Sequence, residues 1–497
     1  MSRFARRLQQ ASGGYISQDV VEPSEGLFFK LPDTLSSSPK KVFAHFFGPY
    51  PIVLDNVDPS NDYYVRNYLA VNGESGIHAE YGGFLRDRPK TNWPYANPYL
   101  STQMFDEINH AKQAGIDGFF VNIMGSSGSN WDRYVALADV ASANYPGFKV
   151  VPMVDANGAM AQNEGESVTA ARVNTILSKS SSYRLGDGRY MVASFKAEGR
   201  TLSWWQNVFN ILSTTYGKEA AFVGVYNNIN QAANYNSVPQ YASGPWGPGA
   251  DPNIFANHGD YAGPARSRGE KVLSAVWPQD IRVRGGLFDE ALNTSCLRAA
   301  WTRAISDNAD IVQLCTWSDY SEGSQVQPSI MRGHVAADIS AYYISRWKTG
   351  AFPAILRDAM YVSHRNQMAN ATITGGQTSF MSHWVRTNRS NFREHVEILT
   401  FFTAPANVSV KIGSNTYSYT APSGMNVQTY PMAAGEVSAK AVRNSSEIAR
   451  INSPVVIKST SVNQDRQYAM FSSLRGTNRQ YDPTPGSSTP NSANFLT

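Results

Sequence analysis

The sequence is poor in cysteine, in charge and in long apolar runs. Only Cys296 and Cys315 are cysteines, which excludes a disulfide scaffold, and we expect two buried thiols instead of a bridge. Charged residues make up 16% of the 497 residues, and the formal net charge is only +4. That balance is too small for this length to indicate nucleic acid binding. No stretch approaches the roughly 18 consecutive apolar residues of a membrane span, so we expect no membrane span.

Several signature motifs are also missing. The first 18 residues, "MSRFARRLQQASGGYISQ", are basic but lack an apolar segment, so we expect no secretory signal. A G-x-S-x-G elbow is absent, which argues against Ser/His/Asp hydrolase chemistry. No G-x-G-x-x-G opens a helix after a strand, and no His/Cys spacing is typical of a metal site. We therefore expect neither a metal nor a cofactor.

Apolar runs and amphipathic stretches alternate through the first two thirds of the chain. Seven continuous runs predict strands buried on both faces: 41–47, 117–123, 149–155, 190–195, 220–226, 271–276 and 310–316. An eighth, weakly marked strand is expected near 253–262. Helical patterns, including 103–114, 293–306 and 332–347, lie between or after them. The alternation favours a (β/α)8 barrel, with a doubly wound open sheet as the alternative.

The pattern changes near residue 356 to short alternating runs separated by Gly, Asn, Pro and Ser, which is typical of an antiparallel β-sandwich. We predict an α/β chain organised as an N-terminal arm (1–37), a catalytic barrel (38–355), a β-sandwich (356–476) and a Pro/Ser-rich tail (477–497). The β-sandwich could be a scaffold for the barrel or a sugar-binding module. We favour the scaffold.

Polar and aromatic side chains follow the predicted strands at their carboxyl ends, where the active site of a barrel forms. Each also fits a structural role: a lone histidine is often a hydrogen-bonded core residue, and Trp277 could serve packing. Their convergence on one rim favours a site. The side chains expected to bind substrate are His45, Asn122, Asp155, Glu198, Tyr226, Asn227, Trp277, Trp317 and Tyr320.

The stretch "TWSDYSEGS" (316–324) places two carboxylates three residues apart after the last strand. Two carboxyls on one loop can be driven apart in pKa by repulsion and burial, which separates an acid from a base. Together with aromatic rings that can stack on sugars, this pair indicates glycoside hydrolysis. We assign Glu322 as the general acid and Asp319 as the base, and the reverse assignment stays open.

Four stretches resemble glycoside hydrolase family 71, the α-1,3-glucanases: "VFAHFFG" (42–48), "HAKQAGIDGFFVNI" (110–123), "YMVASFKAEG" (190–199) and "DIVQLCTWSDYSEGS" (310–324). "FFTAPANVSVKIGSNTYSYTAPSGMNV" resembles the β-domain that follows the family's barrel. The resemblance implies an inverting hydrolysis of an α-glucan-like polysaccharide, with Asp319 and Glu322 on the family's two acids and Trp317 and Tyr320 on its aromatics. Inversion implies carboxyls about 6.5–9.5 Å apart.

The chain departs from the family pattern around the two acids, where Ser318 replaces the usual Asn and Ser321 the usual Gly. These changes leave open a second hypothesis, a catalytically weak carbohydrate-binding adhesin. Because family members are usually secreted, an enzyme without an export signal suggests a phage tail component that docks on other virion tail proteins through residues 1–37. A bacterial enzyme of the cytoplasm or of non-classical export is the alternative.

Overall fold

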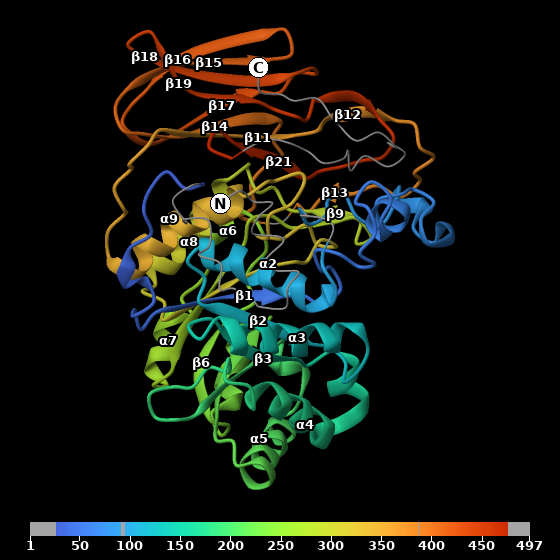
Figure 1. The fold of residues 1–497 in the computed structure, drawn as a ribbon, viewed down its shortest axis with the longest axis vertical. Coiled ribbons are helices and arrows are strands. Elements are labelled where there is room, and N and C mark those ends of the chain that lie inside the picture. The colour runs from blue at the N-terminus through green and yellow to red at the C-terminus, as the bar shows by residue number, and fades with distance from the viewer. Residues whose placement is uncertain (1–25, 91–94, 386, 476–497) are drawn as a thin grey trace.

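The computed structural model describes residues 26–90, 95–385 and 387–475. A closed barrel of eight parallel strands forms one half of the molecule, and antiparallel sheets stack above it (Figure 1). Within those ranges, no helix has the length and apolarity needed to cross a bilayer.

The predicted (β/α)8 barrel is confirmed, because β1 closes the ring by pairing with both β2 and β10. The burial of β2 and β5 along their whole length explains why these strands are continuously apolar. The barrel strands are β1 (Lys41–Phe46), β2 (Gly118–Ile123), β3 (Lys149–Asp155), β4 (Tyr190–Phe195), β5 (Ala220–Tyr226), β6 (Gln240–Pro245), β7 (Lys271–Val276) and β10 (Ile311–Leu314).

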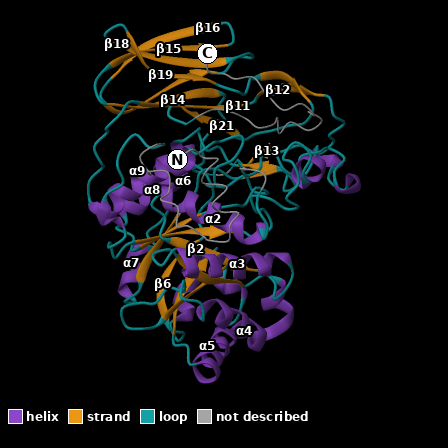
Figure 2. Ribbon diagram, viewed as in Figure 1, coloured by secondary structure: helices purple, strands orange, loops and turns teal. Residues whose placement is uncertain are grey.

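Helices surround this barrel and bury their apolar faces against the strands (Figure 2). They are α2 (Tyr99–Gln113), α3 (Ser129–Asn144), α4 (Gly165–Leu177), α5 (Leu202–Tyr216), α6 (Pro252–Asn257), α7 (Ala262–Ser267), α8 (Ser295–Ser306) and α9 (Val335–Thr349). Both cysteines are buried free thiols, as predicted.

The position predicted for the eighth strand is wrong. Residues 253–262 contain most of α6 and the start of α7, and the strand is β6, which lies earlier in the chain. Its sequence "QYASGP" is short of apolar residues because it packs tightly against β7. A Cβ atom on Gly244 would lie 2.2 Å from the Leu273 carbonyl oxygen, so only glycine fits.

The predicted antiparallel β-sandwich is also confirmed. One sheet has the strand order β17-β14-β11-β21 and the other β16-β15-β18-β19, and one apolar core lies between them. In β15 buried and exposed residues alternate strictly, which explains the period-two pattern of the sequence. The strands are β11 (Ala359–Arg365), β14 (His395–Phe402), β15 (Ala406–Ile412), β16 (Asn415–Ala421), β17 (Gly424–Pro431), β18 (Val437–Arg443), β19 (Ser446–Asn452) and β21 (Tyr468–Ser472).

Shorter strands join the two halves at one side. The hairpin β8 (Ile281–Arg282) and β9 (Leu287–Phe288) follows β7, and β9 pairs with β13 (Ser382–His383) of the C-terminal part. Within the C-terminal part, β12 (Gln367–Ile373) pairs with β20 (Lys458–Ser461). A hairpin of the barrel is thus hydrogen-bonded to the β-domain.

The predicted N-terminal arm is wrong in its last part. Residues Leu27, Phe28 and Phe29 are buried, and the ring of Phe28 stacks on Phe401 of β14 at 4.0 Å between centroids. This segment therefore forms part of the core between barrel and β-domain. Residues 1–25 and 476–497, which hold the rest of the predicted arm and all of the predicted tail, lie outside the described residues.

Candidate active site

The loop that carries the two predicted acids is fixed between neighbouring barrel loops. The Trp317 amide donates a hydrogen bond of 2.8 Å to the carbonyl of His45 at the end of β1. On the other side, the Ile281 amide donates a bond of 2.7 Å to the carbonyl of Glu322. Because both neighbours come from the carboxyl ends of barrel strands, the loop 315–328 is held at the rim where barrel enzymes place their chemistry.

Asp319 is a buried carboxyl whose Oδ1 accepts three hydrogen bonds. The donors are the Ser321 amide at 2.9 Å, the Ser321 hydroxyl at 2.6 Å and the Glu322 amide at 3.1 Å. Burial raises the pKa of Asp319, and these bonds pull it back because they stabilise the carboxylate. The pKa of Asp319 is raised overall, and the three hydrogen bonds limit that rise by stabilising the carboxylate.

Glu322 lies in a different environment. Its side chain is 27% exposed, so it is open to a ligand, and its Oε1 lies 3.2 Å from Arg282 Nη1. Burial and the nearby charges of Asp319 and Asp280 raise the pKa of Glu322 well above its usual range, against the opposing effect of Arg282. The two carboxyls thus differ in the way that an acid and a base must differ.

Arg282 was not predicted and organises this cluster. From β8 it forms a two-bond ion pair with the buried Asp280, at 2.8 Å from Nε and 2.8 Å from Nη2, and also reaches Glu322. Asp280 is 1% exposed. Its two bonds to Arg282 make it the buried partner of that arginine. No periodic pattern marks Arg282 in the sequence, because it lies in a hairpin whose two strands are only two residues long.

Aromatic side chains form one wall beside Asp319. The Tyr50 ring lies 5.8 Å from that of Phe47 and 6.0 Å from that of Tyr68, and both of these neighbours are half-buried. Burial raises the pKa of Tyr50, and the charge of Asp319 raises it further. The hydroxyl therefore stays protonated beside the carboxylate. Half-buried rings next to polar groups are typical of sites that bind sugars.

A second aromatic group lies at the mouth of the barrel. The Trp246 ring lies 4.9 Å from the His45 ring and 4.5 Å from the Phe195 ring. Burial lowers the pKa of His45 to about 3, so this histidine is neutral and accepts or donates hydrogen bonds without carrying a charge. Trp246 was missed because it directly follows β6, the strand that was misplaced.

Asn122 and Asp155 meet at the same mouth, where Asn122 Nδ2 donates a bond of 3.3 Å to Asp155 Oδ2. Glu198 lies farther along the rim, and its Oε1 accepts the Asn228 amide at 2.8 Å. Asn227 is exposed. Direct substrate contact by Asn122, Asp155, Glu198 and Asn227 stays a prediction.

Four predicted substrate-binding aromatics lie in the core and cannot contact a substrate directly. Each is at most 1% exposed. The Trp277 indole donates to the Trp246 carbonyl at 3.0 Å, which places it behind the mouth as a support. The aromatics are Tyr226, Trp277, Trp317 and Tyr320.

Trp317 shows why these positions were misjudged. Its indole donates a bond of 2.7 Å to Glu107 on α2, away from the barrel mouth. Burial raises the pKa of Glu107 to about 8. The side chain of Trp317 therefore anchors the loop of the two acids to a helix.

The described residues contain no group of three or more His, Cys, Asp or Glu side chains arranged to hold a metal ion. The site that the structure assembles therefore consists of carboxyls, one arginine, amides and aromatic rings.

The comparisons with known proteins bear on this site. Residues 291–471 match the model of glycosyl hydrolase family 71. The matched range contains Asp319, Glu322 and most of the β-domain. The chain is also 24% identical, over 392 residues, to the glucan endo-1,3-alpha-glucosidase agn1 of Schizosaccharomyces pombe, a match that covers 73% of this chain and 89% of the relative. Both matches support a glycoside hydrolase related to family 71.

Solved structures resemble the chain more distantly. The GH99 endo-alpha-mannosidase from Bacteroides thetaiotaomicron is 13% identical, with a TM-score of 0.48 over 62% of this chain and 98% of that chain. A glycosyl hydrolase family 2 member from Bacteroides cellulosilyticus is 10% identical, with a TM-score of 0.42 over 71% of this chain and 43% of that chain.

Trp246 gives a prediction about binding. Replacing Trp246 with alanine removes a ring from the barrel mouth, so we expect KM for a polysaccharide to rise about tenfold with little change in kcat, as for a group that binds ground state and transition state alike. The matched control is Trp384→Ala, which removes a half-buried tryptophan of the β-domain. Steady-state kinetics on both variants test this, and equal KM values for Trp246→Ala and Trp384→Ala would contradict it.

Proposed function

We propose that the chain is a glycosidase that cleaves an α-glucan-like polysaccharide, of the α-1,3-glucanase kind, by an inverting mechanism. The observation that carries the proposal is the difference between the two rim carboxyls. Asp319 accepts three hydrogen bonds that favour its ionised form, and Glu322 is accessible and has a raised pKa. One ionised and one protonated carboxyl are what glycoside hydrolysis needs.

In this proposal Glu322 is the general acid. It gives its proton to the glycosidic oxygen while the bond from that oxygen to the anomeric carbon breaks. Asp319 accepts a proton from a water molecule whose oxygen forms the new bond to the same carbon, on the opposite face of the ring. The proton returns from Asp319 to Glu322 through solvent. Arg282 positions Glu322 through the contact of 3.2 Å between its Nη1 and Glu322 Oε1, to which the guanidinium can donate a hydrogen bond while Glu322 is protonated.

The substrate assignment rests on the similarity to the fission yeast glucan endo-1,3-alpha-glucosidase and on the aromatic walls of the site. It is tested by reducing-sugar release from a panel of α-1,3-, α-1,4- and β-1,3-glucans. We expect new reducing ends from α-1,3-glucan. Release from the β-linked polymer alone would overturn the assignment.

A second candidate function is a carbohydrate-binding adhesin, and Ser321 favours it. Its hydroxyl bonds to the base at 2.6 Å, where the family's usual glycine has no hydroxyl. A bond that stabilises the Asp319 carboxylate makes it a weaker base. Stable glycan binding without shortening of the chain would favour the adhesin. Docking on a virion through residues 1–37 stays a prediction.

Ser321 also gives a prediction about pH. In Ser321→Ala the hydroxyl bond that lowers the Asp319 pKa is lost, so that pKa rises. Activity needs Asp319 ionised, and the acid limb of the profile of kcat/KM against pH therefore moves to higher pH. The control is Ser203→Ala, on α5 away from the two acids. An unchanged or lowered acid limb would contradict the assignment of Asp319 as base.

A further inference from the structure

A hollow lies in the C-terminal part of the molecule, and neither Asp319 nor Glu322 is among its lining residues. It has a volume of about 280 Å³. Alternate residues of β12, among them Gln367, Ala369 and Ala371, form one side, and Phe380 and Arg466 form the others. The two alanines leave the space that larger side chains would fill. The volume lies just below the range of about 300–1,000 Å³ typical of small-molecule sites, so only a ligand as small as one sugar ring suits it.

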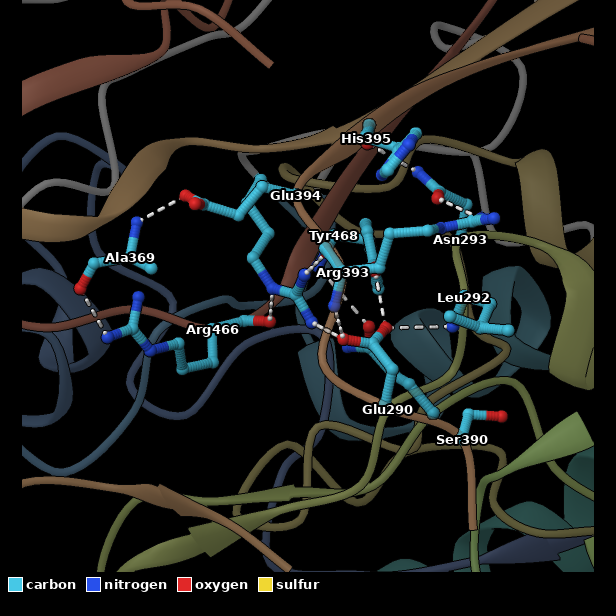
Figure 3. Close-up of polar contacts among 12 residues, drawn as sticks. Glu290, Leu292, Asn293, Ala369, Ser390, Arg393, Glu394, His395, Arg466 and Tyr468 are labelled. Carbon is cyan, nitrogen blue, oxygen red and sulfur yellow. Dashed lines mark hydrogen bonds and ion pairs between the residues drawn. The ribbon is translucent and has the colours of Figure 1, made fainter. Parts of the chain in front are cut away.

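Two buried polar atoms in the lining of this hollow have no partner among the described residues. Arg466 is 9% exposed; its Nη2 donates to the Ala369 carbonyl at 3.0 Å, and its Nη1 is unpaired (Figure 3). Gln367 is 1% exposed; its Nε2 donates to the Asn463 carbonyl at 3.0 Å, and its Oε1 is unpaired. An unmet donor and an unmet acceptor are costly in a buried place. Gln367 and Arg466 thus give the wall of the hollow a polar character, which suits hydroxyl groups because a hydroxyl both donates and accepts.

The positive charges near the hollow are balanced by carboxylates, so they do not require an anionic ligand. The carboxylates of Asp465 and Glu394 stabilise the positive charge of Arg466 and so balance it. The neighbouring Arg365 is paired with Glu290 at 3.0 Å. A neutral ligand therefore fits this site better than a phosphate or a carboxylate.

Phe380 supplies an apolar face on a fixed backbone. Its side chain is among the large apolar side chains that remain exposed, at 47%. The preceding residues are held against the barrel, because the amides of Thr378 and Ser379 donate to the Glu80 carbonyl at 3.0 and 2.8 Å. A rigid ring beside polar atoms can pack on the apolar face of a pyranose.

We propose that this hollow binds one neutral sugar ring of the polysaccharide, as an accessory subsite separate from the two acids. The inference rests on the proposed function, because the glycan it binds is the substrate. Strand β13 begins two residues after Phe380 and pairs with β9, and the β8–β9 hairpin also carries Arg282, the neighbour of Glu322. The segment after Phe380 and the hairpin that carries Arg282 therefore belong to the same small sheet.

The test is binding of full-length protein to insoluble α-1,3-glucan, with Glu322→Gln present in every variant so that the probe is not consumed. We expect Phe380→Ala to weaken binding about tenfold, and Ala371→Leu, which fills the hollow, to do the same. Val385→Ala, which truncates a side chain that is 79% exposed, is the matched control and should bind like the parent.

Equal binding by parent, Phe380→Ala and Ala371→Leu would overturn the subsite and leave the glycosidase proposal intact. If the parent binds no α-glucan and the protein with Glu322 restored cleaves none, the proposed function fails and the subsite fails with it.

Discussion

Glu322→Gln and Asp319→Asn are expected to lower kcat on a good substrate by about two to four powers of ten each, which is the usual contribution of a general acid or base. Glutamine keeps the shape of Glu322 but has no proton of suitable pKa to give to the leaving oxygen. Asparagine at 319 cannot accept the proton of the attacking water. Initial rates of reducing-sugar release measure both losses.

The control for these variants is Asp139→Asn. Asp139 is exposed on α3 and pairs with Lys179 at the surface, so the same chemical change there should leave the rate unaltered. Melting temperatures establish that all three variants fold. A Glu322→Gln or Asp319→Asn variant that keeps more than about a tenth of the activity would remove that residue from the catalytic pair.

Arg365→Met is expected to have the largest effect on stability. Arg365 and Glu290 are 1% and 0% exposed at the side chain, and they form an ion pair of 3.0 Å between β-domain and barrel. Tyr468 adds a bond of 2.6 Å to the same carboxyl (Figure 3). Removing the arginine leaves Glu290 buried without its cation, which typically costs about 3–5 kcal/mol. Urea unfolding measures the change in the free energy of unfolding.

Arg450→Met is the matched control, since Arg450 and Glu447 form an exposed pair whose loss should cost less than about 1 kcal/mol. Equal losses in the free energy of unfolding for the two variants would mean that the buried pair between β-domain and barrel stabilises the protein no more than an exposed pair. A large loss for Arg365→Met supports the scaffold role of the β-domain, because that domain would then be coupled to the stability of the barrel.

The barrel could be predicted from sequence because most of its strands are continuously apolar. β6 could not, since Gly244 and its small neighbours are selected by the close approach of β7 and carry no apolar signal. The same error hid Trp246, the residue that follows this strand. Phe28 was misassigned to an arm because a short apolar segment shows nothing of the distant Phe401 that covers it.

The two acids could be located because they stand close together after a predicted strand. The direction in which a side chain points could not be predicted from the sequence. Trp317 and Trp277 follow strands as predicted, but their indoles donate to Glu107 and to the Trp246 carbonyl, inside the protein. Arg282 comes from a two-residue strand whose only pattern is its pairing with β9, and such pairing is visible only in the folded chain.

The most direct measurement is proton NMR of the first product that the full-length protein forms from an α-1,3-linked gluco-oligosaccharide. Water attacks opposite the bond that breaks, so new reducing ends should appear first as the β-anomer and convert to the equilibrium mixture afterwards. Release of the α-anomer first would contradict inversion by Asp319 and Glu322. Release of no new reducing ends from any α-glucan would contradict the glycosidase assignment itself.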